Sequence, residues 1–296
     1  MWTKETEKEF FRWALSERNC RPEDLFYEVG GKHLFYLPKG VKGSGEVKQG
    51  RNALVGEFTE TWAEKFLKPI VEDMGLYVVR GAIVPELGLV GQKKADIALC
   101  RTSEKHQRLE NIVALVEVKM SIVWNWEWKP AKEEIICIGD FRTHQGRPSV
   151  LRSDTVLKAL GKAVEVRGRG FQGAFFVLCN SPISSDYHEQ VDGCKQLGVI
   201  QGFFSVNPSP VDEAGDEQIN PKRTKQNGFV RWDCVDEAEK VLRSMLAEQN
   251  YFFGGYFPLR ALGRLIETAC TELTNKARRF LELLKGVFQS CKRDDA

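Results

Sequence analysis

Residues 112–120 place the strongest constraint on the fold, because they are apolar at positions that point to both sides of a strand. A strand with two apolar faces has to be covered on both of them, which is typical of a central strand in an α/β sheet. Near its end the segment carries two charged residues, Glu117 and Lys119. Residues i and i+2 of a strand share a face, so both side chains are expected to point the same way, opposite to Val118.

The flanking segments predict helices packed around such a sheet. Apolar residues recur at helical spacing over 3–18, 53–74 and 153–167, whereas 76–84, 95–100 and 173–179 form short strand-like runs. Pro69 is expected to bend the second of these helices or to end it early. Helices and strands in this order predict an α/β core, and the helical pattern after residue 229 predicts an additional helical C-terminal part.

Changes in composition divide the chain into four regions. We expect an N-terminal helix and loop region at 1–52, a core at 53–206, a flexible loop or linker at 207–228 and a helical region at 229–296. Within the last region we expect a helix near 235–248 and a long helix starting at about Pro258. Its apolar stripe either packs on the same chain or forms a dimer seam. Residues 121–150 are expected to be irregular, and Trp124, Trp126 and Trp128 either pack in the core or stack on bases.

Three residues on neighbouring strands carry the chemistry. Asp96 opens one strand, and Glu117 and Lys119 end the next. If these strands pair, Asp96 and Glu117 converge on one cation, and a neighbouring main-chain carbonyl, that of Val118, completes an oxygen-rich site suited to Mg²⁺. Lys119 would then lie where it could orient or help to deprotonate an attacking water.

This pattern resembles the PD-(D/E)xK nuclease superfamily, most closely the type II restriction endonucleases. Residues 53–180 have the α-β-β-β-α-β order of its core, with a mixed central sheet flanked by helices. Ala95 stands where the family name has proline. The resemblance implies Mg²⁺-dependent hydrolysis of double-stranded DNA that leaves 5′-phosphate and 3′-hydroxyl ends. It assigns catalysis to Asp96, Glu117 and Lys119, and the family's additional acid to Glu60, with Glu57 as the alternative.

Basic side chains cluster around these residues although the net charge is only +2. Residues 91–108 contain five Lys or Arg against two acids, and residues 140–170 contain seven against three, so the near-zero total hides local basic regions. Such regions favour contact with a phosphate backbone, the alternative being a solvated face of mixed charge. The candidate DNA-binding residues are Lys93, Lys94, Arg142, Arg147, Arg152 and Lys158.

Several alternatives are open. Glu117 could form an ordinary ion pair with Lys119 or Lys94, or the chain could be a non-catalytic DNA-binding protein on a nuclease-like fold. Within the nuclease class, a DNA repair, junction-resolving or modification-dependent enzyme is the alternative to a restriction enzyme. A homodimer would suit an enzyme that cuts both strands of a two-fold site. The apolar runs are too short for a membrane helix, and no zinc pattern or signal peptide is found, so we expect a cytoplasmic protein with no membrane partner.

Overall fold

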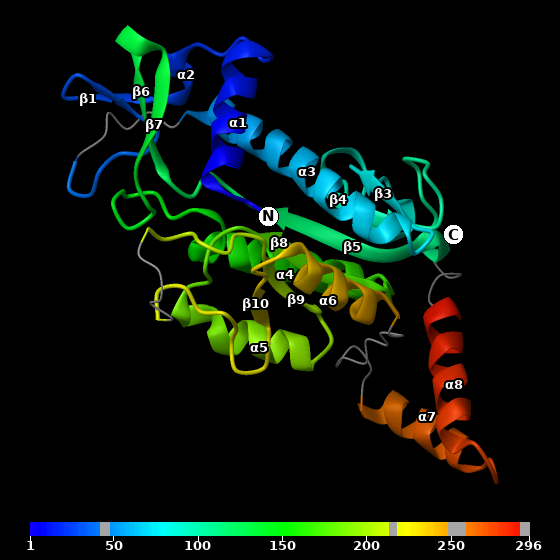
Figure 1. The fold of residues 1–296 in the computed structure, drawn as a ribbon. Helices are drawn as coiled ribbons and strands as arrows, with labels where there is room; N and C mark the ends of the chain where they lie inside the picture. Colours follow the sequence, from blue (N-terminus) through cyan, green and yellow to red (C-terminus); the bar gives the residue numbers. More distant parts are fainter. Residues whose placement is uncertain (42–47, 213–217, 248–258, 291–296) are drawn as a thin grey trace. The chain divides into compact units, whose positions relative to one another are not determined.

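The computed structural model describes residues 1–41, 48–212, 218–247 and 259–290, and the chain divides into two compact units, Met1–Tyr251 and Phe252–Ala296. The first unit contains a six-stranded mixed sheet with the order β10-β9-β8-β5-β4-β3 (Figure 1). Strand β5 (Ile112–Lys119) lies inside it, antiparallel to β4 (Ile97–Cys100) and parallel to β8 (Ala174–Cys179). The central position expected from its two apolar faces is therefore confirmed.

The outer strands extend this sheet in both directions. Strand β3 (Tyr77–Arg80) pairs antiparallel with β4, while β9 (Gly202–Ser205) and β10 (Phe229–Arg231) continue the parallel half. The sheet thus includes a strand that follows the proline-rich segment 207–228. The sequence patterns did not predict β9 or β10, because each is only three or four residues long.

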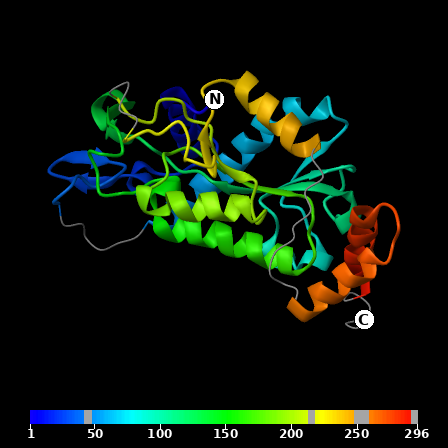
Figure 2. The ribbon, with the colours of Figure 1, turned by 90° about the horizontal axis from the view of Figure 1, so that it is seen from below.

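Helices cover both faces of the six-stranded sheet. Helices α1 (Lys4–Ser16), α3 (Gln49–Glu72) and α6 (Val235–Ala247) share one hydrophobic core with Val116 and Val118 of β5. Helices α4 (Ser153–Gly168) and α5 (His188–Gln196) lie on the other face, in front of the sheet in Figure 2. The order α3-β3-β4-β5-α4-β8 agrees with the predicted order of these elements. Helix α3 continues past Pro69 to Glu72, so the prediction that Pro69 could end the helix early is wrong.

A second, four-stranded antiparallel sheet corrects the expectation that 121–150 is irregular. Its order is β1-β2-β6-β7, in which β6 (Asn125–Lys129) and β7 (Glu134–Gly139) form a hairpin. Strands β1 (Tyr27–Val29) and β2 (Lys32–Leu34) are joined through Gly30 and Gly31, whose φ angles of +56° and +75° favour glycine. The side chains of Trp124 and Trp126 are buried, so the tryptophan alternation reflects packing.

A buried carboxyl group fastens α1 to the segment that leads into β6. Glu7 accepts hydrogen bonds from the Nε1 atoms of Trp2 (3.0 Å) and Trp126 (2.7 Å) and from the backbone amides of Val123 and Trp124. Burial raises the pKa of Glu7 to about 8, even though all four donors favour the charged form. One polar group inside an aromatic core thus ties α1 to the N-terminus, to the segment before β6 and to β6 itself.

The second unit contains two helices, α7 (Leu259–Cys270) and α8 (Lys276–Ser290), where a single long helix was expected. The intervening residues include Asn275, whose φ of +60° interrupts helical geometry, and Leu273, which is fully exposed. The prediction of one long helix with a continuous apolar stripe is therefore wrong. Pro258, where the helix was expected to start, lies outside the described residues.

The remaining elements are short. They are helix α2 (Pro22–Leu25) and the 3-10 helices η1 (Pro85–Leu87), η2 (Gly91–Lys93), η3 (Leu109–Asn111), η4 (Pro130–Lys132), η5 (Ser149–Leu151) and η6 (Ser185–Tyr187). Among the described helices, none combines the length and the apolar composition that crossing a bilayer requires.

Candidate active site

The pairing of β4 with β5 brings the two sequence-predicted carboxylates together. Ile97 lies opposite Val116 in the antiparallel register, so Asp96, just before β4, lies level with Glu117. The backbone amide of Val118 donates a 2.8 Å hydrogen bond to Asp96 Oδ2, which fixes the orientation of that carboxylate. Glu117 is almost fully buried, so its charge requires partners. The expected pairing of the strand that follows Asp96 with the strand of Glu117 is therefore confirmed.

A lysine from α4, which the sequence reasoning missed, joins the two carboxylates. Lys162 Nζ lies 3.2 Å from Asp96 Oδ1 and 2.5 Å from Glu117 Oε2. Both acids therefore converge on a single cationic atom. Burial alone would lower the pKa of Lys162, but the charges of Glu117 and Asp96 more than offset it, and the pKa lies above its usual value.

Lys119 completes this cluster from the opposite side. Its Nζ lies 2.5 Å from Glu117 Oε1 and 3.7 Å from Asp96 Oδ2, so each carboxylate contacts both lysines. The expected ion pair between Glu117 and Lys119 is thus present, whereas Lys94 contributes its carbonyl oxygen to Lys162 at 3.4 Å. Asp96, Glu117, Lys119 and Lys162 are called the carboxylate cluster below.

The two candidates for an additional acid lie in different surroundings on α3. The pKa of Glu60 is raised, first by burial and then by the negative charge of Asp96. Glu57 instead forms an ion pair with Arg18 of the segment that follows α1. Of these two acids, Glu60 is therefore the one whose pKa is raised by the charge of Asp96.

The donor set of the carboxylate cluster fits a small hard cation. Two carboxylate oxygens already share one ammonium group, and Mg²⁺ is usually held by one or two carboxylates together with waters and substrate phosphate. The amide and carbonyl of one strand residue point to the same side, so the Val118 carbonyl points toward the side of Asp96. No group of three or more His, Cys, Asp or Glu side chains in metal-binding proximity occurs in the described ranges. An ion at this place would be held by these two acids and this carbonyl.

Two of the six candidate DNA-binding residues point into a hollow beside the carboxylate cluster. Arg147 and Arg152 line it together with Lys119. Arg152 also pairs with Asp154 at 3.0 Å, whereas Arg147 has no ion-pair partner among the described residues. Both arginines are exposed, so they can exchange present contacts for a ligand.

The other four lie elsewhere. Arg142 pairs at 2.7 Å with Asp140, a buried carboxylate, and this geometry favours a structural role. Lys158 is largely exposed and pairs with Asp154 at 3.4 Å. Lys93 is also exposed, at 3.9 Å from Glu165, and Lys94 contacts the carboxylate cluster only through its backbone.

Comparisons of this chain with protein-family models, with curated proteins and with solved structures give no match. The function is therefore inferred from the geometry of the site itself.

Proposed function

We propose that this protein is a Mg²⁺-dependent endonuclease that hydrolyses phosphodiester bonds of double-stranded DNA. The observation that carries the proposal is the convergence of Asp96 and Glu117 on one cationic atom, Lys162 Nζ, with Lys119 beside both of them. The resemblance of the Asp96, Glu117 and Lys119 pattern to the PD-(D/E)xK nucleases, and the α-β-β-β-α-β order that surrounds it, support the same activity. A restriction-endonuclease-like core with a helical C-terminal part is the fold that goes with it.

The chain's own residues divide the work as follows. Asp96 and Glu117 would hold the ion, and Glu60 would add negative charge at the edge of the site. A magnesium ion, when bound there, would neutralise charge on the phosphate and make an attacking water more acidic. Lys119 would orient that water as an ammonium group, or accept its proton as a neutral amine, because its Nζ lies beside both carboxylates. Attack in line with the departing 3′ oxygen would leave 5′-phosphate and 3′-hydroxyl ends.

A type II restriction enzyme that acts as a homodimer is the most specific form of this proposal. Repair, junction-resolving and modification-dependent nucleases share the same chemistry and differ in the DNA they select. Incubation of mixed plasmid DNA with the protein and Mg²⁺, followed by sequencing of the fragment ends, separates them. Fragments that share one sequence at their ends indicate a restriction enzyme, whereas cuts only at branched, damaged or methylated DNA indicate one of the others.

A non-catalytic role is the second candidate, and the balanced charges of the carboxylate cluster favour it specifically. Two lysines neutralise two carboxylates, so the cluster is a complete ion-pair network without any metal. Glu117→Gln distinguishes the two candidates, because it removes a charge but keeps the shape. A nuclease would lose cleavage by at least about a hundredfold. Absence of Mg²⁺-dependent cleavage of any DNA by the unmodified protein would favour the non-catalytic candidate.

A further inference from the structure

The carboxylate cluster shares Lys119 with a hollow of about 740 Å³ on the other side of that residue. Residues of α3, of the β5–β6 segment and of the start of α4 form its walls. Its charged members are Arg51, Lys119, Arg147 and Arg152, and no Asp or Glu is found among the described residues that line it. We call it the cationic pocket. A lining with four cations and no acid favours a negatively charged occupant, above all at Arg51 and Arg147, because Lys119 and Arg152 already pair with acids outside the pocket.

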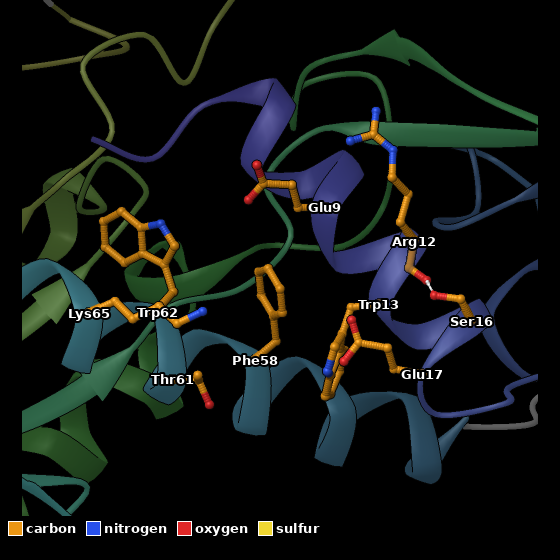
Figure 3. A pocket seen from close by; sticks show the side chains of 9 residues that line it. All are labelled: Glu9, Arg12, Trp13, Ser16, Glu17, Phe58, Thr61, Trp62 and Lys65. Atoms are coloured by element: carbon orange, nitrogen blue, oxygen red, sulfur yellow. Dashed lines mark hydrogen bonds between the residues drawn. The ribbon is translucent and has the colours of Figure 1, made fainter.

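A second hollow, between α1 and α3, shows that this charge pattern is not a general property of the surface (Figure 3). It measures about 520 Å³ and contains the two acids Glu9 and Glu17 as well as the two cations Arg12 and Lys65. Arg12 also pairs with Glu5 at 2.8 Å. The hollow of Figure 3 therefore contains as many acids as cations. In the cationic pocket, Lys119 and Arg152 pair with acids that lie outside it, whereas Arg51 and Arg147 have no ion-pair partner among the described residues.

Arg51 is the most informative member of the cationic pocket, because its guanidinium group is buried without a carboxylate. Its Nη1 donates to the carbonyl oxygens of Leu25 (3.1 Å) and Phe35 (2.6 Å), and its Nη2 lies 3.5 Å from the hydroxyl of Tyr27. The side chain is only 8% exposed and lies over the rings of Phe35 and Tyr27. No carboxylate of the described residues lies within ion-pair distance of it.

Such a buried charge costs free energy unless something compensates it. Carbonyl oxygens and aromatic faces compensate part of the charge and hold the side chain in place. A guanidinium group has five N–H donors, and no more than three have a partner among the described groups. A tetrahedral anion in the cationic pocket would supply both the missing charge and the missing acceptors.

We propose that the cationic pocket binds a phosphate group of the nucleic acid next to the phosphate that is cleaved. Arg51 and Arg147 are its principal ligands, and Lys119 connects it to the carboxylate cluster. This inference rests on the proposed nuclease function. It adds the side of the carboxylate cluster toward which the bound DNA strand continues, which is the side of the cationic pocket. The phosphate belongs either to the interior of a duplex or to the 5′ end of a strand, since both carry the same chemical group.

Binding of fluorescent duplex DNA in EDTA tests this without requiring cleavage. Arg147→Gln removes one positive charge from an exposed side chain, so folding should be retained. We expect its affinity to fall about tenfold and the slope of log affinity against log salt concentration to decrease by about one. Arg12→Gln, an equal loss of charge in the hollow of Figure 3, is the matched control and should leave affinity within about twofold.

Arg51→Lys provides a second test, because it keeps the charge but loses the fork of donors. We expect a loss of affinity of about fivefold, provided that circular dichroism and the unfolding midpoint are close to those of the unmodified protein. A duplex closed by hairpins at both ends and an open duplex with 5′-phosphates distinguish an internal from a terminal phosphate. Equal effects on both indicate an internal phosphate, and an effect on the open duplex alone indicates a terminal one.

Failure of this inference is distinguishable from failure of the nuclease proposal. If the unmodified protein cuts DNA but Arg147→Gln binds both duplexes as tightly as Arg12→Gln does, the cationic pocket is not a phosphate site, although the nuclease proposal stands. If the protein neither cuts nor binds DNA, the nuclease proposal itself fails.

Discussion

The carboxylate cluster and the cationic pocket lie on either side of Lys119 and compensate their charges in different ways. In the carboxylate cluster, the buried Glu117 and the partly buried Asp96 meet two lysines, and every charge has a partner from the protein. In the cationic pocket, Arg51 is also buried, but its partners among the described residues are carbonyl oxygens, aromatic rings and the hydroxyl of Tyr27. One region is thus charge-compensated by the protein itself, whereas Arg51 in the other has no carboxylate partner among the described residues. For this reason we propose an exchangeable cation for the first region and a bound anion for the second.

Asp96→Asn should have the largest effect and should affect the carboxylate cluster alone. The amide oxygen can still accept the hydrogen bond from Val118, so the local structure is retained, but the charge that would hold the ion is lost. We expect cleavage to fall by at least about a hundredfold while DNA binding in EDTA is unchanged. Plasmid cleavage and fluorescence anisotropy measure the two quantities. A variant that still cuts at the original rate would show that Asp96 has no part in catalysis.

Lys162→Met tests whether a cation is exchanged in the carboxylate cluster. Loss of the ammonium group leaves both acids less well compensated, so the free energy of unfolding should fall by about 3 kcal/mol in EDTA. Saturating Mg²⁺ should restore much of this loss, because the ion takes the place that Lys162 Nζ held. Chemical denaturation with and without Mg²⁺ measures both effects.

Lys158→Met is the matched control for that experiment, since Lys158 lies one turn earlier on α4 and is largely exposed. Its unfolding free energy should change little, with or without Mg²⁺. If Mg²⁺ fails to stabilise Lys162→Met more than it stabilises Lys158→Met, the cluster is a permanent ion-pair network.

Acidification should destabilise the wall of the cationic pocket. His144 is buried, its ring stacks on Tyr36 of that wall at 4.1 Å, and burial lowers its pKa to about 4. In the unfolded state, His144 therefore takes up a proton near pH 6.5, whereas in the folded state it stays neutral until about pH 4. The free energy of unfolding therefore decreases as the pH falls toward 4. Between pH 7 and 5 the loss is about 2 kcal/mol.

His144→Phe keeps the stacked ring but cannot take up the proton, so denaturation curves at both pH values should show less loss than in the unmodified protein. Glu7 acts in the opposite direction in both proteins. Its raised pKa means that the folded state gains a proton, and with it stability, as the pH falls below about 8. The difference between the two proteins therefore isolates His144, and identical pH dependence would contradict the assignment.

The smallest effects are expected from Arg152, which directly precedes α4, and from Lys158 of α4. Arg152 lines the cationic pocket but is also paired with Asp154, so Arg152→Gln should weaken duplex binding in EDTA by only about threefold. Lys158→Gln should change it less than twofold, because Lys158 does not line the cationic pocket. Equal losses from both variants would mean that a broad basic surface, and no particular pocket, binds the DNA.

Sequence reasoning was most successful where the pattern repeats over a short distance. The apolar faces of β5 and the helical spacing in α3 and α4 are visible within single segments, and the residues around Asp96 and Glu117 follow from the strand period of two. Lys162 left a weaker signal of the same kind. It lies beside Ala159 and Ala163 on the inward side of α4, where an unpaired charge would not be expected.

Hydrophobic periodicity is a local property, so the amino-acid sequence alone predicts the alternation of helices and strands and the positions of Asp96, Glu117 and Lys119 at the ends of two strands. Which charges meet depends on how these elements pack. The tertiary structure joined Lys162 to two acids distant in the chain, assigned Arg142 to Asp140, and buried Arg51 against the carbonyls of Leu25 and Phe35. The compensation of a buried charge depends on contacts between segments that no spacing within one segment encodes.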